Sequence, residues 1–230
     1  AALAAAGKNV LLIDLDSQAS LTISVGMEPL EVPKTIVDVL KKDGAPIREC
    51  VQKINDRLHI VTSIIDLAPM EMEMLSRASR EKILDRALKP IKDGYDYILI
   101  DCPPSLGLIT TNALNASDSV LIPVQCEYYA LEGLSQLMSS VQAVKRRYND
   151  RLELEGVLLT MYDGRLNLTQ QVVTEIKKYF PRKVFATVIP RTVRLSEAPS
   201  YGQPILYYDK SNKGCIAYGA LVDEILKKNR

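Results

Sequence analysis

The sequence predicts an α/β fold, a doubly wound and mainly parallel sheet flanked by helices. Apolar runs of strand length alternate along the chain with longer stretches of helical period, which is the pattern of βαβ units. Two of these runs, VLLIDLD at 10–16 and YILIDCPPS at 97–105, end in carboxylates. An open parallel sheet gathers its ligands at the carboxyl ends of its strands, so both runs point to one site.

The composition favours a single domain over residues 1–230. The chain is 47% hydrophobic and 25% charged, with a formal net charge of +1. A balance so close to neutral argues against a protein that coats nucleic acid everywhere, although it allows a local basic face. The four cysteines form no C-x-x-C pair, so we expect reduced thiols in the cytoplasm rather than a zinc site or disulfides.

Each element is predicted in chain order from apolar runs that Gly, Pro and Asp interrupt. The chain opens in AALAAAG, a helix tail that ends at Gly7. The predicted strands are Val10–Asp14, Leu58–Val61, Tyr97–Asp101, Ser119–Pro123, Gly156–Met161 and Val184–Ile189.

Helices are predicted where apolar residues recur with helical period between those strands. They are Thr35–Lys42, Leu67–Ser76, Arg80–Lys92, Leu106–Asn115, Leu131–Tyr148, Leu168–Tyr179 and Gly214–Lys228. The last of these follows its preceding segment directly and is expected to pack on the core, which disfavours a membrane partner. No apolar run reaches the roughly 20 residues that span a bilayer.

Three acids at strand ends are the strongest candidates for chemistry. Asp14 and Asp16 are two residues apart, so alternation along a strand sends both carboxylates to the same side. Asp101 ends its apolar run and is followed by Cys102-Pro103-Pro104, a stiff exit that stops the strand. An ordinary alternative stands beside this for the first pair: Asp14 caps a turn while Asp16 is solvated.

Five segments after the apolar runs should surround one site: 14–18, 101–106, 123–127, 161–165 and 190–201. The stretches that contain them also carry a resemblance. They are LLIDLDSQAS, YDYILIDCPPSLGLITTNAL, VLIPVQCEYYALEGL, GVLLTMYDGRLNL and VIPRTVRLSEAPSYGQPI. In order and spacing they resemble the ParA/Soj-type chromosome-partitioning ATPases of the deviant-Walker ParA/MinD group. The resemblance implies a P-loop NTPase-like fold of the SIMIBI class, with ATP and Mg²⁺ as cofactors.

The resemblance also implies roles for individual residues. Asp16 matches the acid that orients the attacking water, Asp14 would lie beside the phosphate loop, and Asp101 would hold Mg²⁺ through water. Residues in two later loops match the adenine pocket: Met161, Asp163, Pro190 and Arg191.

Partners follow from the same resemblance. In such proteins ATP closes a homodimer that binds double-stranded DNA without sequence preference, and Arg165 and Arg194 stand at the DNA-contacting positions. A ParB-type centromere-binding protein would stimulate hydrolysis and release the DNA. These features imply a nucleoid-associated protein in the cytoplasm.

One expected motif is absent from the sequence. No glycine-rich loop of the form G-x-x-x-x-G-K-[ST] occurs, nor the family's deviant version with its signature lysine. We therefore expect the first strand and the P-loop to be missing through N-terminal truncation, and the 230 residues alone to be inactive. The alternative is a non-catalytic DNA-binding or protein-interaction module, which would bind DNA without dependence on ATP.

Overall fold

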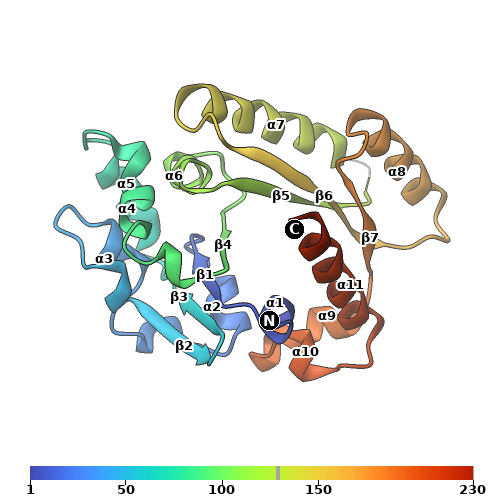
Figure 1. The fold of residues 1–230 in the computed structure, drawn as a ribbon, viewed down its shortest axis with the longest axis horizontal. Coiled ribbons are helices and arrows are strands. Elements are labelled where there is room, and N and C mark those ends of the chain that lie inside the picture. The colour runs from blue at the N-terminus through green and yellow to red at the C-terminus, as the bar shows by residue number, and fades with distance from the viewer. Residues whose placement is uncertain (128–129, 230) are drawn as a thin grey trace. The chain divides into compact units, whose positions relative to one another are not determined.

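Residues 1–127 and 130–229 are described by a computed structural model, which divides into two units (Figure 1). The first unit comprises residues 3–117 and 199–204, and the second comprises residues 118–198 and 205–229. The single domain predicted for residues 1–230 stays a prediction.

The first unit is built on a four-stranded sheet in the order β2-β3-β1-β4. Its strands are β1 (Val10–Asp14), β2 (Val51–Asn55), β3 (Leu58–Val61) and β4 (Tyr97–Asp101). Because β1 runs parallel to both β3 and β4, the carboxyl ends of these three strands meet at one edge. Asp14 lies opposite Asp101 in the register of β1 and β4, so the fold brings two of the predicted acids together.

Helices cover this sheet through an apolar core. Leu11 and Ile13 of β1 pack with buried residues of helices that connect the strands, such as Ile36, Met74 and Leu84. Helices among the first 117 residues are α1 (Ala2–Ala5), α2 (Ser20–Ser24), α3 (Ile36–Leu40), α4 (Leu67–Met74), α5 (Ile83–Leu88) and α6 (Leu108–Ala116). Short 3₁₀ turns connect them at η1 (Pro29–Glu31), η2 (Ile47–Glu49), η3 (Arg80–Lys82) and η4 (Lys92–Gly94).

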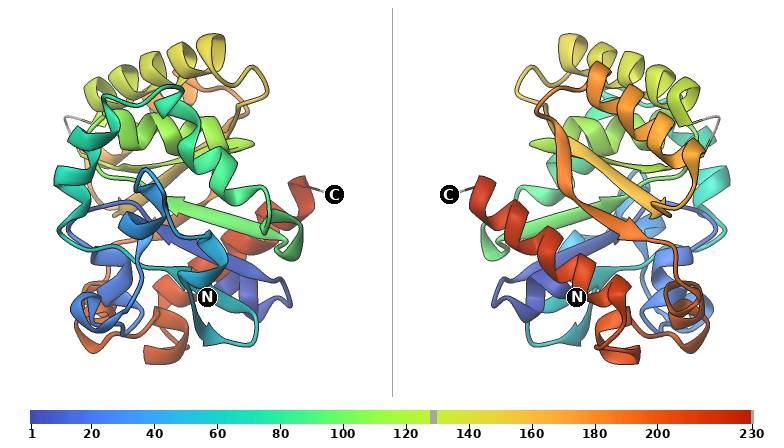
Figure 2. Two further views of the ribbon diagram at one scale, coloured as in Figure 1. Left: turned by 90° about the vertical axis from the view of Figure 1, so that its left-hand side faces the viewer. Right: turned by 90° about the vertical axis from the view of Figure 1, so that its right-hand side faces the viewer.

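The second unit is built on three parallel strands in the order β5-β6-β7. These are β5 (Ser119–Gln125), β6 (Glu153–Tyr162) and β7 (Val184–Pro190). Alternation along β6 divides its side chains between the two faces: Val157 and Leu159 pack with α7 and α8, whereas Leu158 packs with α11. Both faces are therefore covered, and α11 lies along β7 (Figure 2).

The second unit contains the long amphipathic helices. They are α7 (Ala130–Arg147), α8 (Asn167–Tyr179) and α11 (Lys213–Lys228), with the short helices α9 (Val193–Glu197) and α10 (Ile205–Tyr208) and the 3₁₀ turn η5 (Ala198–Tyr201) nearby in sequence. No helix among the described residues is long and apolar enough to cross a membrane.

The predicted α/β class with mainly parallel strands is confirmed, with three differences in detail. The described strands form two sheets rather than one, and β2 is an antiparallel strand that the sequence did not predict. The single helix predicted over Arg80–Lys92 is instead a 3₁₀ turn, the six-residue α5 and a second 3₁₀ turn. Pro90 explains where α5 stops: the amide of Lys89 donates to the Asp85 carbonyl, and Pro90 has no amide hydrogen to make the next bond of the helix.

Candidate functional site

Asp14 is a fully buried carboxylate at the end of β1. Its Oδ2 accepts hydrogen bonds from the amide of Thr22 at 2.9 Å and from the hydroxyl of Thr22 at 2.8 Å. Its Oδ1 accepts from the amide of Asp16 at 3.1 Å. Three donors offset the cost of burying this group, so Asp14 fixes the turn that follows the strand.

Thr22 extends this network to the neighbouring strand. The amide of Ser63, just beyond β3, donates to the Thr22 hydroxyl oxygen at 3.0 Å. The hydroxyls of Thr62 and Ser63 are fully buried and have no hydrogen-bond partner within the described part of the chain. The carboxyl ends of β1 and β3 are thus joined by a buried polar network.

Asp16 lies two residues beyond β1 and is only half-buried. Its Oδ1 accepts from the amide of Gln18 at 2.9 Å, and Oδ2 receives no hydrogen bond from any residue that the structure describes. Because the strand ends at Asp14, strand alternation does not place Asp16; the turn held by Asp14 does. Within the described part of the chain, the side chain is therefore held at one oxygen only and remains partly exposed.

Asp101 completes the acidic cluster from the end of β4. Its carbonyl oxygen accepts from the amide of Leu15 at 2.9 Å, which continues the β1–β4 pairing past Asp14. Solvent reaches the side chain, but desolvation by the surrounding protein, followed by the negative charges of Asp14 and Asp16, raises its pKa to about 6. The structure therefore brings Asp14, Asp16 and Asp101 together in one electronegative site.

The segment after Asp101 is anchored by a carboxylate from another helix. Glu71 of α4 accepts from the amide of Ile109 at 3.1 Å, in the first turn of α6. Burial, and next the Asp101 charge, raise the pKa of the Cys102 thiol to about 12, so this cysteine is not a reactive thiolate. A β-carbon at Gly107 would lie 2.3 Å from Glu71 Oε1, so a larger residue there would require the Glu71 side chain to shift.

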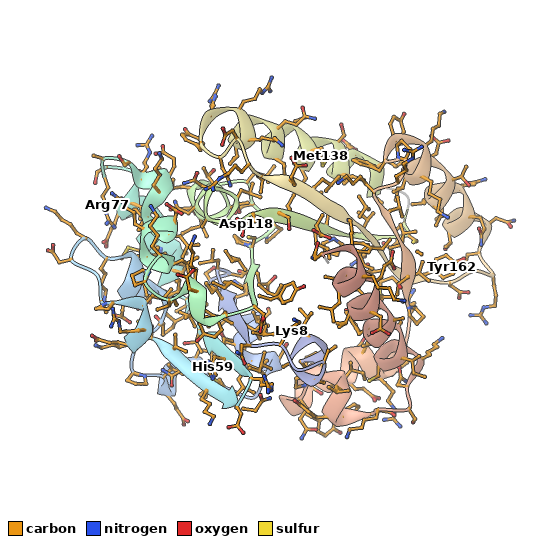
Figure 3. The ribbon with its side chains drawn as sticks, viewed as in Figure 1. Lys8, His59, Arg77, Asp118, Met138 and Tyr162 are labelled. Carbon is orange, nitrogen blue, oxygen red and sulfur yellow. The ribbon has the colours of Figure 1, made fainter. Side chains whose placement is uncertain are left out.

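In the second unit, the predicted nucleotide residues lie at the carboxyl ends of β6 and β7: Met161 and Pro190 within the strands, Asp163 and Arg191 just beyond them. Tyr162 pairs with Pro190, and the amide of Arg191 donates to the Tyr162 carbonyl at 3.2 Å, so the two loops are adjacent (Tyr162 is labelled in Figure 3). Met161 has φ +52°, a left-handed backbone that is unusual for a side chain of this kind. Ala19, Ser79 and Arg182 also have positive φ, so the role of Met161 stays a prediction.

Asp163 and Arg165 form an ion pair within the same loop. Arg165 Nε donates to Asp163 Oδ1 at 2.9 Å and Nη2 donates to Oδ2 at 2.6 Å. These hydrogen bonds hold the pKa of the Asp163 carboxyl well below its usual range. Arg194 lies at the start of α9 and pairs with Glu197 at 3.0 Å.

Not every predicted segment falls in one unit. The segments 14–18 and 101–106 belong to the first unit, whereas 161–165 and most of 190–201 belong to the second. Of the predicted segment 123–127, also in the second unit, Cys126 donates its amide to Thr160 at 3.2 Å. That all five surround one site stays a prediction.

Sequence reasoning missed the supporting residues Thr22, Ser63 and Glu71. Each acts through contacts with residues distant in sequence, for example 41 positions between Ser63 and Thr22. The single histidine, His59, lies on β3 (Figure 3) with Nδ1 at 2.9 Å from the Tyr95 hydroxyl.

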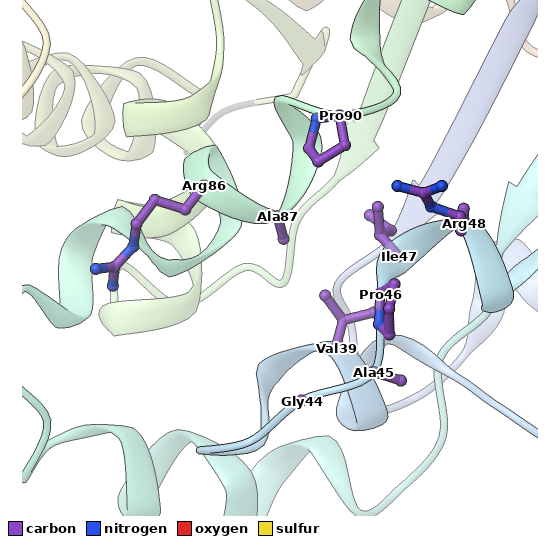
Figure 4. A pocket seen from close by; sticks show the side chains of 9 residues that line it. All are labelled: Val39, Gly44, Ala45, Pro46, Ile47, Arg48, Arg86, Ala87 and Pro90. Atoms are coloured by element: carbon purple, nitrogen blue, oxygen red, sulfur yellow. The ribbon is translucent and has the colours of Figure 1, made fainter.

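Two further observations concern a hollow away from these residues and direct metal binding. A hollow of about 280 Å³ in the first unit contains none of the predicted site residues (Figure 4). It is lined by Val39, Gly44, Ala45, Pro46, Ile47, Arg48, Arg86, Ala87 and Pro90. Among the described residues, no group of three or more His, Cys, Asp or Glu side chains could hold a metal ion directly.

Comparisons with known proteins find one consistent family. The model of a family described as an AAA domain (AAA_31) matches residues 1–154. The sporulation initiation inhibitor protein Soj of Bacillus subtilis (strain 168) is 52% identical over 225 residues, covering 98% of this chain and 89% of the relative. The chromosome partitioning protein ParA of Myxococcus xanthus (strain DK1622) is 48% identical over 230 residues, covering 100% of this chain and 81% of the relative.

A solved structure shares the fold. The cobyrinic acid a,c-diamide synthase of Mycobacterium smegmatis with bound ADP and magnesium superposes with a TM-score of 0.85 and 35% identity, covering 100% of this chain and 87% of that one. The family model spans more than half of the chain, and both relatives are similar to it over nearly all of its length. The chain therefore belongs to the Soj/ParA family of chromosome-partitioning ATPases.

Proposed function

We propose that this chain provides the catalytic acids of an ATP-dependent DNA-partitioning ATPase, whose ATP-bound dimer binds DNA without sequence preference. The single observation that carries the proposal is the cluster of Asp14, Asp16 and Asp101 at the carboxyl ends of β1 and β4. Phosphoryl transfer needs little covalent chemistry from a protein. It needs groups that position the nucleophile and neutralise charge.

Each acid has a distinct role in this proposal. Asp16 orients the attacking water, because the Gln18 amide holds one of its carboxylate oxygens while the side chain remains partly exposed. Asp14 is fully hydrogen-bonded and buried, so it holds the loop rather than reacting. Desolvation, and next the negative charges of Asp14 and Asp16, raise the pKa of Asp101 to about 6.

The cluster fits a magnesium ion that is held through water. A divalent cation relieves the repulsion that now favours protonation of Asp101. Magnesium usually keeps several waters and takes one or two carboxylates, so the lack of a three-carboxylate cage among the described residues agrees with indirect binding. When bound, the ion would neutralise phosphate charge. The related structure with ADP and magnesium supports this choice of cofactors.

The loops after β6 and β7 supply the proposed adenine pocket. Met161 and Pro190 end these strands, and Asp163 and Arg191 follow them. The Tyr162–Arg191 hydrogen bond joins the two strand ends. The same part of the chain carries Arg165 and Arg194, which we propose as contacts to DNA phosphates. A ParB-type partner would stimulate hydrolysis and release the DNA, which places the active dimer on the nucleoid.

Nucleotide binding is tested first, by titrating the purified protein with a fluorescent ATP analogue with and without magnesium. Saturable binding that depends on magnesium and weakens in Asp101→Asn supports the proposal. We expect the 230 residues alone to show no turnover, because their sequence contains no G-x-x-x-x-G-K-[ST] loop to cradle phosphates. DNA binding that never responds to ATP would instead favour a non-catalytic module.

The roles of Asp16 and the arginines are tested separately. In a chain that also carries a phosphate-binding loop, Asp16→Ala should keep ATP-driven dimerisation and abolish turnover, and a loss of dimerisation would assign Asp16 to nucleotide binding. Arg165→Ala and Arg194→Ala should each weaken binding to unrelated duplexes and lower the slope of log affinity against log salt by about 1 for each phosphate that the variant no longer binds. Unchanged affinity and slope in both variants would show that the DNA face lies elsewhere.

A further inference from the structure

Both arginines proposed to contact DNA are already paired with carboxylates of their own chain. Arg165 makes a two-pronged contact with Asp163, at 2.9 Å and 2.6 Å, and its amide donates to the same carboxylate at 3.1 Å. Its side chain is nevertheless 89% exposed. A ligand from solvent can therefore reach this guanidinium without any movement of the core.

Arg194 is held by a larger cluster on α9 and α10. Its Nη1 donates to Glu197 Oε2 at 3.0 Å, and its Nε lies 3.7 Å from Asp209 Oδ2. The Tyr208 hydroxyl donates to the same Glu197 oxygen at 3.2 Å, and the guanidinium lies 5.9 Å from the Tyr208 ring centroid. The Arg194 side chain remains 53% exposed, so this cluster is also open to solvent.

A DNA phosphate competes with these carboxylates for the same donors. The planar fork of a guanidinium matches carboxylate and phosphate alike. When a phosphate displaces a carboxylate from Arg194, the net binding free energy is therefore only the difference between the arginine–phosphate and arginine–carboxylate contacts. The displaced carboxylate stays close, because Glu197 is three residues from Arg194 and Asp163 two residues from Arg165. Its charge then repels the neighbouring phosphates of the duplex.

We infer that Asp163 and Glu197 limit the affinity of this protein for DNA by occupying the arginines that would otherwise bind phosphate. The inference rests on the proposed function, in which Arg165 and Arg194 bind DNA. It assigns the two carboxylates a regulatory role: they keep the contacts of both arginines with DNA weak enough for the protein to dissociate from DNA. Any change that removes their charge strengthens binding.

Glu197 is the better residue to test, because Asp163 also belongs to the proposed nucleotide loop. Glu197→Gln keeps the size of the side chain and removes its charge. With the exposed ion pair removed, DNA affinity should rise about two- to fivefold. The gain should shrink as salt rises, since screening weakens the same pair in the unmodified protein. Glu197→Asp retains the charge and should restore affinity toward that of the unmodified protein.

A matched control separates this effect from net charge. Glu153 is an exposed carboxylate of the same unit, paired with Lys145 at 2.8 Å, and Glu153→Gln changes the net charge by the same amount. It should raise DNA affinity less than Glu197→Gln. The double variant Glu197→Gln/Arg194→Ala should lose the gain altogether, because the gain depends on the freed arginine.

The experiment measures binding of a fluorescent duplex to each folded variant at saturating ATP and magnesium, across a salt series. A gain specific to Glu197→Gln that disappears without Arg194 supports the inference. If Arg194→Ala weakens binding but Glu197→Gln gains no more than Glu153→Gln, or keeps its gain without Arg194, the inference is wrong while the DNA face stands. If neither arginine variant changes binding, the proposed DNA face and this inference both fail.

Discussion

The buried carboxylate of Asp14 accepts two hydrogen bonds from one residue, Thr22, whose hydroxyl oxygen in turn accepts from the amide of Ser63. This arrangement connects the ends of β1 and β3 and fixes the turn that carries Asp16. The geometry of the acidic cluster thus depends on a threonine that takes no part in the proposed chemistry.

Thr22→Val tests that dependence, because valine keeps the shape of threonine and removes its hydroxyl. The change leaves a buried carboxylate oxygen short of a donor and the Ser63 amide without its acceptor. We expect the free energy of unfolding in urea to fall by about 2–3 kcal/mol. Thr22→Ser, which retains the hydroxyl, should lose less than half as much. Equal stability of all three proteins would show that the network adds nothing.

Asn112 offers a second buried network, this time between α5 and α6. Its Oδ1 accepts from the amides of Ile83 and Leu84, and its Nδ2 donates to the carbonyls of Arg80 and Leu108. Asn112→Ala removes the cap of α5 and leaves buried groups unpaired, so we expect a loss of about 3 kcal/mol.

The control for this variant is Asn167→Ala, at an exposed position in the first turn of α8. It should change the free energy of unfolding by no more than about 0.5 kcal/mol. A similar loss in both asparagine variants would mean that the hydrogen bonds of Asn112 do not account for the loss of stability.

These networks mark the limit of prediction from the sequence. β3 and β4 were predicted with their observed bounds, because short apolar runs between turn residues have few other ways to be buried. β2 was missed, since VQKIN has no continuous apolar pattern and is a strand only through pairing with β3. The acids of the site were found at strand ends, whereas Thr22 and Glu71 were not, because their partners are defined only after folding.

The raised pKa of Asp101 predicts a dependence of stability on pH. This pKa is about 6 in the folded protein, and an unfolded chain has an aspartate pKa of about 3.9. The folded state therefore binds the proton more tightly. The stability that this proton gives the folded state is fully present below about pH 4 and is lost as the pH rises through 6.

Asp101→Asn removes this dependence, because asparagine stays neutral. The full shift corresponds to about 2–3 kcal/mol, but solvent reaches the side chain, so we expect the variant to be more stable by only about 1 kcal/mol at pH 8 and equally stable near pH 4. Urea unfolding with EDTA across this range measures the difference. The exposed Asp43→Asn serves as a control for the loss of one negative charge. An Asp101→Asn curve parallel to that of the unmodified protein would contradict the prediction.

Gly26 and Gly202 cross closely in the first unit, although 176 positions separate them in the sequence. A β-carbon on Gly202 would lie 2.6 Å from the Gly26 Cα, and one on Gly26 would lie 2.8 Å from the Gly202 carbonyl oxygen. Both residues also have positive φ, at +83° for Gly26 and +61° for Gly202. Alanine at either position therefore combines a clash against backbone with a strained conformation, and we expect a loss of about 3 kcal/mol or more.

Two other glycines separate these contributions. Gly7 has φ +86° but open space around its missing β-carbon, so Gly7→Ala should cost only the conformational part, about 1 kcal/mol. Gly133 lies inside α7 with open space, so Gly133→Ala should instead stabilise the protein by up to about 1 kcal/mol. Thermal and urea unfolding of the four variants should give the order Gly133, Gly7, then the crossing pair. If Gly202→Ala were as stable as Gly7→Ala, the close crossing would not constrain the segment 199–204.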